Sequence, residues 1–205
     1  ISGVSLTSGS SCLGIHNDGS VHGVQSPDIT GIFSGDGIDG VQGQLTAIPL
    51  QFIENAGQSE DAVRFMIISD GASVFFTPEG LTFKGISGEG DAAVPYYSGY
   101  RFLGANPAPE IKGLDHGDGC VNFLVGDDPS EWVTGVPVYR EIEYLDIYPG
   151  IDLTYEGTAD GLKSTFSVAP GVSPGNIILE YQGIGDIAIG PDGALRVHLP
   201  HAGGG

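Results

Sequence analysis

Basic residues are scarce in this sequence. Its 205 residues include 7 lysines and arginines against 26 aspartates and glutamates, which gives a formal net charge of −19. A chain with this charge repels the phosphates of nucleic acids and the headgroups of anionic lipids. We therefore expect no nucleic-acid partner, and we interpret the acidity as solvation in a saline or cell-surface setting. Binding of divalent cations between carboxylates is the alternative interpretation.

Long hydrophobic runs and helix-forming windows are also missing. No apolar run reaches the ~20 residues that a membrane-spanning helix needs, so we expect no membrane insertion. Few windows are rich in alanine, glutamate, lysine and leucine, whereas 35 residues are glycine. This composition predicts short strands joined by tight turns. The sequence begins Ile-Ser-Gly, and we expect an exported, extracellular protein whose signal peptide has been removed.

Cysteine is almost absent, since only Cys12 and Cys120 are present. One pair in an exported chain is compatible with a single disulfide, which an oxidising environment preserves. A free cysteine nucleophile would need a neighbouring base and a lowered pKa. We therefore predict a disulfide that involves Cys12 and Cys120, either within one subunit or between subunits.

The sequence divides into three parts. Residues 1–48 are rich in glycine and serine with scattered aliphatic residues, and they predict an N-terminal arm of short edge strands or a flexible segment. Residues 49–200 contain about a dozen short strand-like segments at regular spacing, which predict an all-β domain. The expected fold is an antiparallel β-sandwich, jelly-roll-like or similar, with the Gly-rich N-terminal extension. Residues 201–205 are interpreted as a flexible tail.

Alternation and turn signals give the clearest strand predictions. Residues 63–84 predict a three-stranded meander, with Asp70-Gly71 as its first hairpin turn. Residues 86–94 show no apolar pattern and predict a loop. The strand predicted over residues 96–103 has two faces; one carries Tyr97, Gly99 and Arg101, and the other carries Tyr96, Tyr100 and Phe102.

The stretch of residues 127–152 contains the only tryptophan and three tyrosines. We interpret Trp132 as a buried core anchor. Tyr148 and Pro149 begin a predicted Pro-Gly turn between two paired strands, and Asp152 is predicted to accept a hydrogen bond that fixes this turn. The stretch therefore predicts architecture rather than chemistry.

Several short motifs resemble those of a known family. They are FIENAGQ at 52–58, VRF at 63–65, GLTF at 80–83, GANP at 104–107, VNFLVG at 121–126, DPSEW at 128–132, YPGIDLTY at 148–155 and VAPG at 168–171. Together they are similar to the all-β domain at the N-terminus of large secreted bacterial and archaeal proteins that carry β-propeller-type SBBP repeats. The resemblance implies an extracellular all-β module of unknown biochemical function, and it implies no catalytic residues.

The chain departs from that family in three ways. Residues 1–48 have no recognised counterpart, Cys120 is particular to this chain, and members usually run on past residue 200. Missing strands would leave a sheet edge that must be covered, charged or paired. A strand from the same or a neighbouring subunit could fill the edge by β-augmentation. The alternative is that the chain is a fragment.

Motifs for catalysis and for tight metal binding are missing. The five histidines lack zinc-site spacing, and the Gly-rich stretches lack a phosphate-loop ending. Two carboxylate pairs, Asp36 with Asp39 and Asp115 with Asp118, are candidates for weak calcium binding. The alternative is that these aspartates are solvated turn residues, because the Asp side chain can hydrogen-bond to the local backbone of a turn. We expect no other cofactor.

Three classes of function follow from these patterns. We expect a non-enzymatic structural subunit of an extracellular assembly, such as a cell-surface sheath, S-layer-like coat or filament. It would form homo-oligomers or polymers through strand edges and disulfides. The alternative is an adhesion or carbohydrate-binding module of a secreted protein, with Tyr96, Tyr97 and Tyr100 as candidate glycan contacts. A hydrolase is the third class, and no motif supports it.

Overall fold

The part of the chain that the structure describes folds into β-strands with almost no helical structure. The computed structural model describes residues 11–16, 21–23, 50–69, 72–87, 94–158, 161–191, 193 and 195–198. Two 3₁₀ turns, η2 (Pro129–Glu131) and η3 (Pro174–Asn176), lie between strands, and none of the helices in the described ranges is long or apolar enough to span a bilayer. The strands are β1 (Ser11–His16), β2 (Val21–Gly23), β3 (Phe52–Glu54), β4 (Phe65–Ser69), β5 (Ala72–Thr77), β6 (Gly80–Ser87), β7 (Val94–Phe102), β8 (Glu110–Leu124), β9 (Val133–Tyr148), β10 (Ile151–Thr158), β11 (Gly161–Val168), β12 (Leu179–Gln182), β13 (Asp186–Ile189) and β14 (Leu195–His198).

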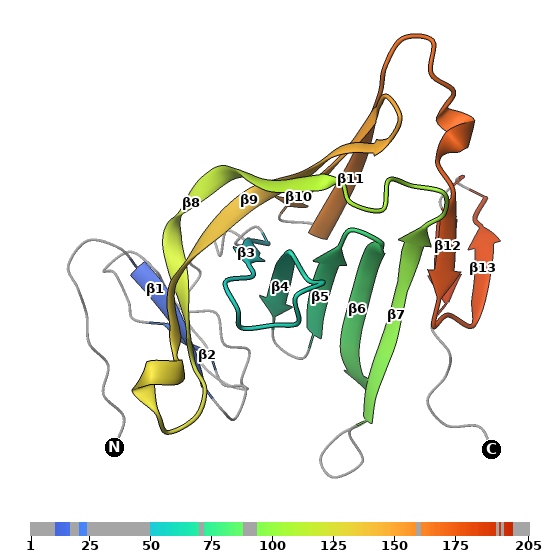
Figure 1. The fold of residues 1–205 in the computed structure, drawn as a ribbon. Coiled ribbons are helices and arrows are strands. Elements are labelled where there is room, and N and C mark those ends of the chain that lie inside the picture. The colour runs from blue at the N-terminus through green and yellow to red at the C-terminus, as the bar shows by residue number, and fades with distance from the viewer. Residues whose placement is uncertain are drawn as a thin grey trace, which may run out of the picture.

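Twelve of these strands form one continuous sheet. Its order is β12-β7-β6-β5-β4-β3-β9-β8-β1-β2, and β10 and β11 branch from β9. Neighbouring strands are antiparallel except β1 and β8, which run parallel. The antiparallel pair β13 and β14 forms a separate small sheet, and Figure 1 shows β13 beside β12.

The sheet forks at β9. On the side of β9 opposite β8, Val138 and Tyr139 pair with β3, whereas residues 141–148 pair with β10. One branch therefore contains β3 to β7 and β12, and the other contains β10 and β11. Register shifts interrupt the pairing of β8 with β9, and such irregularities bend and twist strands. In Figure 1 the bent β8 and β9 cross above β3–β7, so that the sheet curls on itself.

The larger hydrophobic core lies between the two branches. Phe52 of β3 and Phe76 of β5 pack against Tyr144 of β9 and Tyr155 of β10. The Phe76 ring contacts Phe52 and Tyr155 edge-on, with centroid distances of 5.2 and 5.1 Å. A smaller core cluster, which includes Val121, lies along the other part of β8 and β9. Because full burial of such a side chain stabilises by about 1.5–3 kcal/mol, these clusters hold the curl together.

The predicted fold class is confirmed as an all-β, mainly antiparallel protein. The finer prediction of a jelly-roll-like sandwich is not confirmed, because twelve of the fourteen described strands belong to one curled sheet instead of dividing between two facing sheets. The meander over residues 63–84 is confirmed as β4, β5 and β6. The loop predicted over residues 86–94 is wrong at its ends, because Ser87 pairs with Val94 and extends the β6–β7 hairpin.

The predicted N-terminal arm contributes two short strands. β1 joins the main sheet next to β8, and β2 pairs with β1. The remainder of residues 1–48, the predicted turn at Asp70-Gly71 and the tail at residues 201–205 lie outside the described residues.

Candidate functional site

A hollow lies on the outer face of β6, β7 and β12, on the side away from the core. Strand alternation sets the two faces. Leu81 and Tyr100 pack on the larger core cluster, so their neighbours Gly80, Thr82 and Arg101 face outward. The hollow, which we call the β6–β7–β12 hollow, has a volume of about 440 Å³. This volume lies within the range of small-ligand sites.

Three glycines form the floor of the hollow. Gly99 of β7 lies between its register partners Thr82 of β6 and Gln182 of β12. A Cβ atom at Gly80, Gly99 or Gly183 would collide with a backbone carbonyl oxygen of an adjacent strand. Glycine is the residue that permits such a close approach of two backbones. The close approach therefore leaves the floor without side chains.

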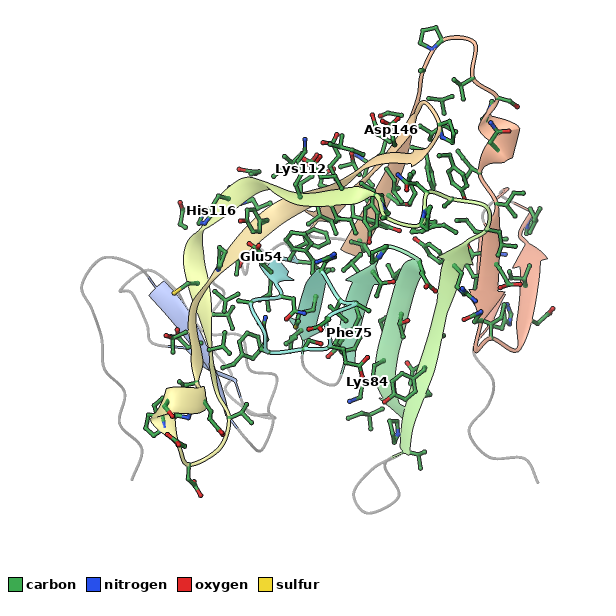
Figure 2. The ribbon with its side chains drawn as sticks, in the orientation of Figure 1. Glu54, Phe75, Lys84, Lys112, His116 and Asp146 are labelled. Carbon is green, nitrogen blue, oxygen red and sulfur yellow. The ribbon has the colours of Figure 1, made fainter. Side chains whose placement is uncertain are left out.

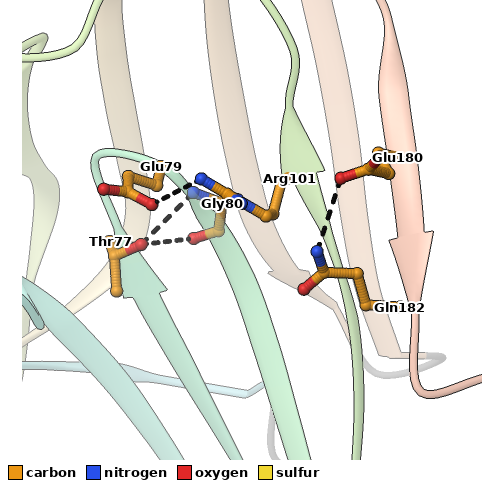
Figure 3. Close-up of polar contacts among 6 residues, drawn as sticks. All are labelled: Thr77, Glu79, Gly80, Arg101, Glu180 and Gln182. Atoms are coloured by element: carbon orange, nitrogen blue, oxygen red, sulfur yellow. Dashed lines mark hydrogen bonds and ion pairs between the residues drawn. The ribbon is translucent and has the colours of Figure 1, made fainter.

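Polar side chains and one aromatic ring form the walls. The Tyr97 side chain is 55% exposed. The Arg101 guanidinium donates from Nη2 to Glu79 Oε2 at 2.9 Å, and Gln182 Nε2 donates to Glu180 Oε2 at 3.4 Å (Figure 3). An exposed ion pair such as Arg101–Glu79 stabilises a fold by only about 0.2–1 kcal/mol. The main consequence of the two contacts is a set of planar polar groups held on neighbouring strands.

The turn from β5 to β6 positions Glu79. Thr77 Oγ1 donates to the Gly80 carbonyl oxygen at 3.1 Å and accepts from the Gly80 N–H at 3.2 Å, as Figure 3 shows. Pro78 restricts φ at the first central position of the turn. The Phe102 N–H donates to the Glu79 carbonyl oxygen at 2.9 Å, which ties the turn to β7. Hydrogen bonds within the turn and to β7 therefore fix the backbone that carries the Glu79 carboxylate.

Buried tyrosines support the hollow from the inner face of the sheet. The hydroxyls of Tyr100 and Tyr155 share a hydrogen bond of 2.7 Å, and the Tyr144 hydroxyl donates to the Thr77 carbonyl oxygen at 3.2 Å. Burial raises the pKa of all three hydroxyls above the ordinary tyrosine value. They therefore remain protonated at neutral pH and act as structural hydrogen-bonding groups.

The free edge of β11 is a second exposed feature. All eight residues of β11 pair with β10 without a bulge, and no described strand pairs with the opposite edge. The strand contains no proline, and its one charged side chain, Lys163, pairs with Glu156 of β10 at 3.2 Å. Edge strands are usually protected by charge, proline or bulges. We call this feature the β11 edge, and it is open to pairing with another strand.

The structure places the backbones of the two cysteines opposite each other. Cys12 of β1 is the register partner of Cys120 of β8, and Cys120 is disulfide-bonded. This register favours a bond within one chain over a bond between subunits.

The predicted calcium ligands have different surroundings. Asp115 and Asp118 share the Arg140 guanidinium, at 3.2 Å from Nη1 and 3.6 Å from Nη2 respectively. A protein cation therefore already lies between the two carboxylates. Asp36 and Asp39 are outside the described residues. In the ranges that the structure covers, no three His, Cys, Asp or Glu side chains are grouped to hold a metal ion, and calcium binding stays a prediction.

Polar contacts hold the bend of β8 and β9 against β3. Tyr139 donates its hydroxyl hydrogen to Glu54 Oε2 at 3.1 Å, and burial raises the pKa of this hydroxyl. The His116 ring packs edge-on against Tyr139 at 5.3 Å. Figure 2 shows Lys112 and His116 along β8, and Lys112 Nζ lies 3.1 Å from Glu143 Oε2. These contacts join three strands, and they form no nucleophile–base pair.

The Pro-Gly turn has the predicted structure. Tyr148 is 2% exposed, Pro149 is exposed and Gly150 has a φ of 72°. Asp152 Oδ1 accepts a hydrogen bond from the Asp146 N–H at 2.7 Å. Asp152 therefore fixes the turn between β9 and β10, as its position in the sequence predicts.

The prediction that Trp132 anchors the core is wrong. Its ring is only partly buried and belongs to neither core cluster. Trp132 follows the η2 turn at the tip of the β8–β9 hairpin (Figure 1), and its Nε1 donates to the Gly126 carbonyl oxygen at 3.2 Å. Asp128 caps this turn by accepting from the Ser130 N–H and hydroxyl, which lowers the pKa of the carboxyl. The tip lies beyond the part of β9 that packs in the larger core.

The three tyrosines predicted as glycan contacts are separated. Tyr96 packs against Phe83 with ring centroids 6.2 Å apart and covers Gly85, whereas the Tyr100 hydroxyl is used in the core. Tyr97 and Tyr100 both line the hollow, and of these two only Tyr97 offers an exposed side chain. The sequence does not reveal the glycine floor, because it depends on the register of three separate strands.

A family profile covers most of this fold. It matches residues 52–203 and is described as a domain of unknown function (DUF7948). The chain belongs to the DUF7948 family. No curated protein and no solved structure matches the chain. Membership of the DUF7948 family assigns no function, and the resemblance to the domain of SBBP repeat proteins stays a prediction.

Proposed function

We propose that this DUF7948 domain is a non-enzymatic structural subunit of an extracellular assembly at the cell surface, such as a sheath, coat or filament. The observation that carries the proposal is the unprotected β11 edge. A strand from another copy that pairs with this edge would bind through backbone hydrogen bonds. Where the second copy offers a different edge, the contact is heterologous and continues from copy to copy.

An exposed apolar surface gives further support. Four side chains on one face of the β13–β14 sheet, Ile187, Ile189, Leu195 and Val197, are 40, 76, 49 and 36% exposed. A two-stranded sheet is marginally stable alone, and exposed apolar patches mark interaction surfaces. A neighbouring subunit that covered this face would stabilise both the hairpin and the contact.

At a finer level, we propose that the two branches of the sheet act as the layers of a sandwich. The β10–β11 branch and the β3–β7 branch share the larger core cluster. This arrangement would give a subunit rigid enough to transmit force through its edges. The net charge of −19 would keep the remaining surface solvated outside the cell.

Assembly can be tested by sedimentation and electron microscopy over a series of protein concentrations. We expect the unmodified chain to form ordered oligomers or polymers. Thr165→Lys places a charge on the β11 edge, and we expect it to raise the concentration needed for assembly by about tenfold, equivalent to ~1.4 kcal/mol. Thr82→Lys is the matched control, since Thr82 is an exposed threonine on a central strand.

Two results would overturn the proposal. One is a chain that stays monomeric at every concentration. The other is assembly of Thr165→Lys at the same concentration as the unmodified chain and Thr82→Lys.

A second candidate function is that of an adhesion or carbohydrate-binding module of a secreted protein. The specific observation in its favour is the exposed Tyr97 ring beside the glycine-floored hollow.

A further inference from the structure

The β6–β7–β12 hollow is a feature that the proposed assembly does not need. It lies on the branch of the sheet that does not carry the β11 edge. Its polar pairs are exposed and add little to stability. Its floor is kept clear by glycines where any other residue would collide with backbone. The space is therefore built by the fold, and its side chains are free to contact a ligand.

We infer that the hollow binds a neutral carbohydrate, with a sugar ring lying on the glycine floor against Tyr97. A pyranose presents C–H groups on the faces of its ring. An exposed aromatic ring offers a flat apolar partner for such a face. Pairs of aromatic rings contribute ~0.5–1.5 kcal/mol beyond area burial, and we expect a similar contribution from the sugar face. With 55% of its side chain exposed, Tyr97 has this surface available at the edge of the hollow.

The polar walls match the hydroxyls of a sugar. A hydroxyl both donates and accepts, so it binds best where a donor and an acceptor lie side by side. Arg101 has five N–H donors, one of which is used on Glu79 Oε2 at 2.9 Å, so up to four remain beside the carboxylate. Gln182 and Glu180 repeat this arrangement on β12. Hydrogen bonds to the charged groups would be stronger than those between neutral groups.

Charge selects a neutral ligand over an anionic one. Among the residues that line the hollow, the Glu79 carboxylate is paired with the Arg101 guanidinium. A second carboxylate, Glu180, lies next to the lining residue Gln182, and the whole chain carries −19. Uronic acids, sialic acids and phosphorylated sugars would enter a repulsive field. A hydroxyl-rich neutral saccharide avoids this cost and can still form hydrogen bonds with the polar groups of the walls.

The test uses the full chain with soluble neutral oligomers of β-glucan, mannan and chitin, and with galacturonate oligomers as the acidic comparison. Saturation-transfer NMR should show transfer to sugar C–H protons of at least one neutral series, and calorimetry should give its affinity. Tyr97→Ala should weaken that affinity by about fivefold to tenfold, consistent with loss of an aromatic contact. Tyr97→Phe should keep the affinity within about twofold, because it keeps the ring.

Two lysine substitutions separate this site from the assembly surface. Thr82→Lys extends a side chain over the floor and should abolish binding, whereas Thr165→Lys on β11 should bind as the unmodified chain does. Ile189→Ala truncates an exposed apolar residue elsewhere and should also have no effect. The inference is overturned if no neutral series binds, if the acidic oligomers bind as well as the neutral ones, or if Tyr97→Ala or Thr82→Lys keeps the full affinity. None of these outcomes depends on whether the chain assembles.

Discussion

Alkaline pH is expected to unfold this protein through its buried tyrosines. Tyr144 and Tyr155 are 0 and 1% exposed, and Tyr100 is packed beside them. Burial raises the pKa of each of the three hydroxyls, so the folded chain keeps these protons after the unfolded chain has lost them. Their contribution to stability is therefore complete below the unfolded pKa of about 10 and is lost progressively as the pH rises above it.

The expected effect is large compared with the stability of a typical domain. Each buried hydroxyl lowers the free energy of unfolding by about 1.4 kcal/mol per pH unit between its unfolded and folded pKa values. Three such groups give a slope of about 4 kcal/mol per pH unit. A stability of ~5–15 kcal/mol would then be exhausted within roughly one to four pH units above 10.

The slope can be measured by urea titrations at a series of pH values from neutral to strongly alkaline. Tyr144→Phe should reduce it by about a quarter to a third, since one of the three core ionisations is removed while Tyr139, whose pKa is also raised, keeps its own contribution. Tyr97→Phe removes an exposed tyrosine and should leave the slope unchanged. Tyrosinate absorbance of the buried groups should rise together with the loss of β-sheet circular dichroism. Ionisation of all eight tyrosines while the sheet stays folded, or an unaltered slope in Tyr144→Phe, would refute the reasoning.

The remaining predictions concern the disulfide, the Pro-Gly turn and the core. The register of Cys12 with Cys120 predicts an intramolecular bond, so non-reducing gels should show the monomer mass, and a high-mass ladder that collapses on reduction would contradict it. Reduction should cost up to roughly 4.7 kcal/mol of stability, the chain-entropy value for a loop on the order of 100 residues. Asp152→Ala should cost about 1 kcal/mol in a denaturant titration and Asp152→Asn much less, because asparagine keeps an oxygen that can accept from the Asp146 N–H; equal losses would argue against that hydrogen bond. Phe76→Ala should lower the free energy of unfolding by about 3–5 kcal/mol, and a decrease below ~1 kcal/mol would show that Phe76 does not pack in the larger core.

Local strand patterns were predictable because their signals lie within a few residues of each other. The alternation over residues 96–103 correctly separates Tyr97 and Arg101 from Tyr100 and Phe102, which the structure places on opposite faces of β7. The three-stranded meander is equally local. In both cases a period of two residues decides which side chains reach the core.

Features that depend on distant pairing were not predictable. The sequence Gly113-Leu-Asp-His-Gly-Asp-Gly119 has the composition of a loop, yet it lies inside β8. β9 supplies register partners for Gly113, Leu114 and His116, and a register shift follows before Cys120. Glycine and aspartate are poor strand formers, so only tertiary context can place them there. The prediction that Trp132 is a buried core anchor was wrong for a related reason. An aromatic residue is buried only where the fold brings a second layer, and the hairpin tip lies beyond the larger core.

The fork at β9 explains how one sheet can offer two independent surfaces. A closed barrel has no free edges, and its strands pair on both sides. Here β3 and β10 share one side of β9, which forces the strands into two branches that enclose the larger core between them. The first branch turns an outer face to solvent, where close-packed glycines form the hollow, and the second ends in the unpaired β11 edge. Because the two surfaces lie on different branches, a lysine at Thr82 and a lysine at Thr165 should have opposite effects on carbohydrate binding and assembly.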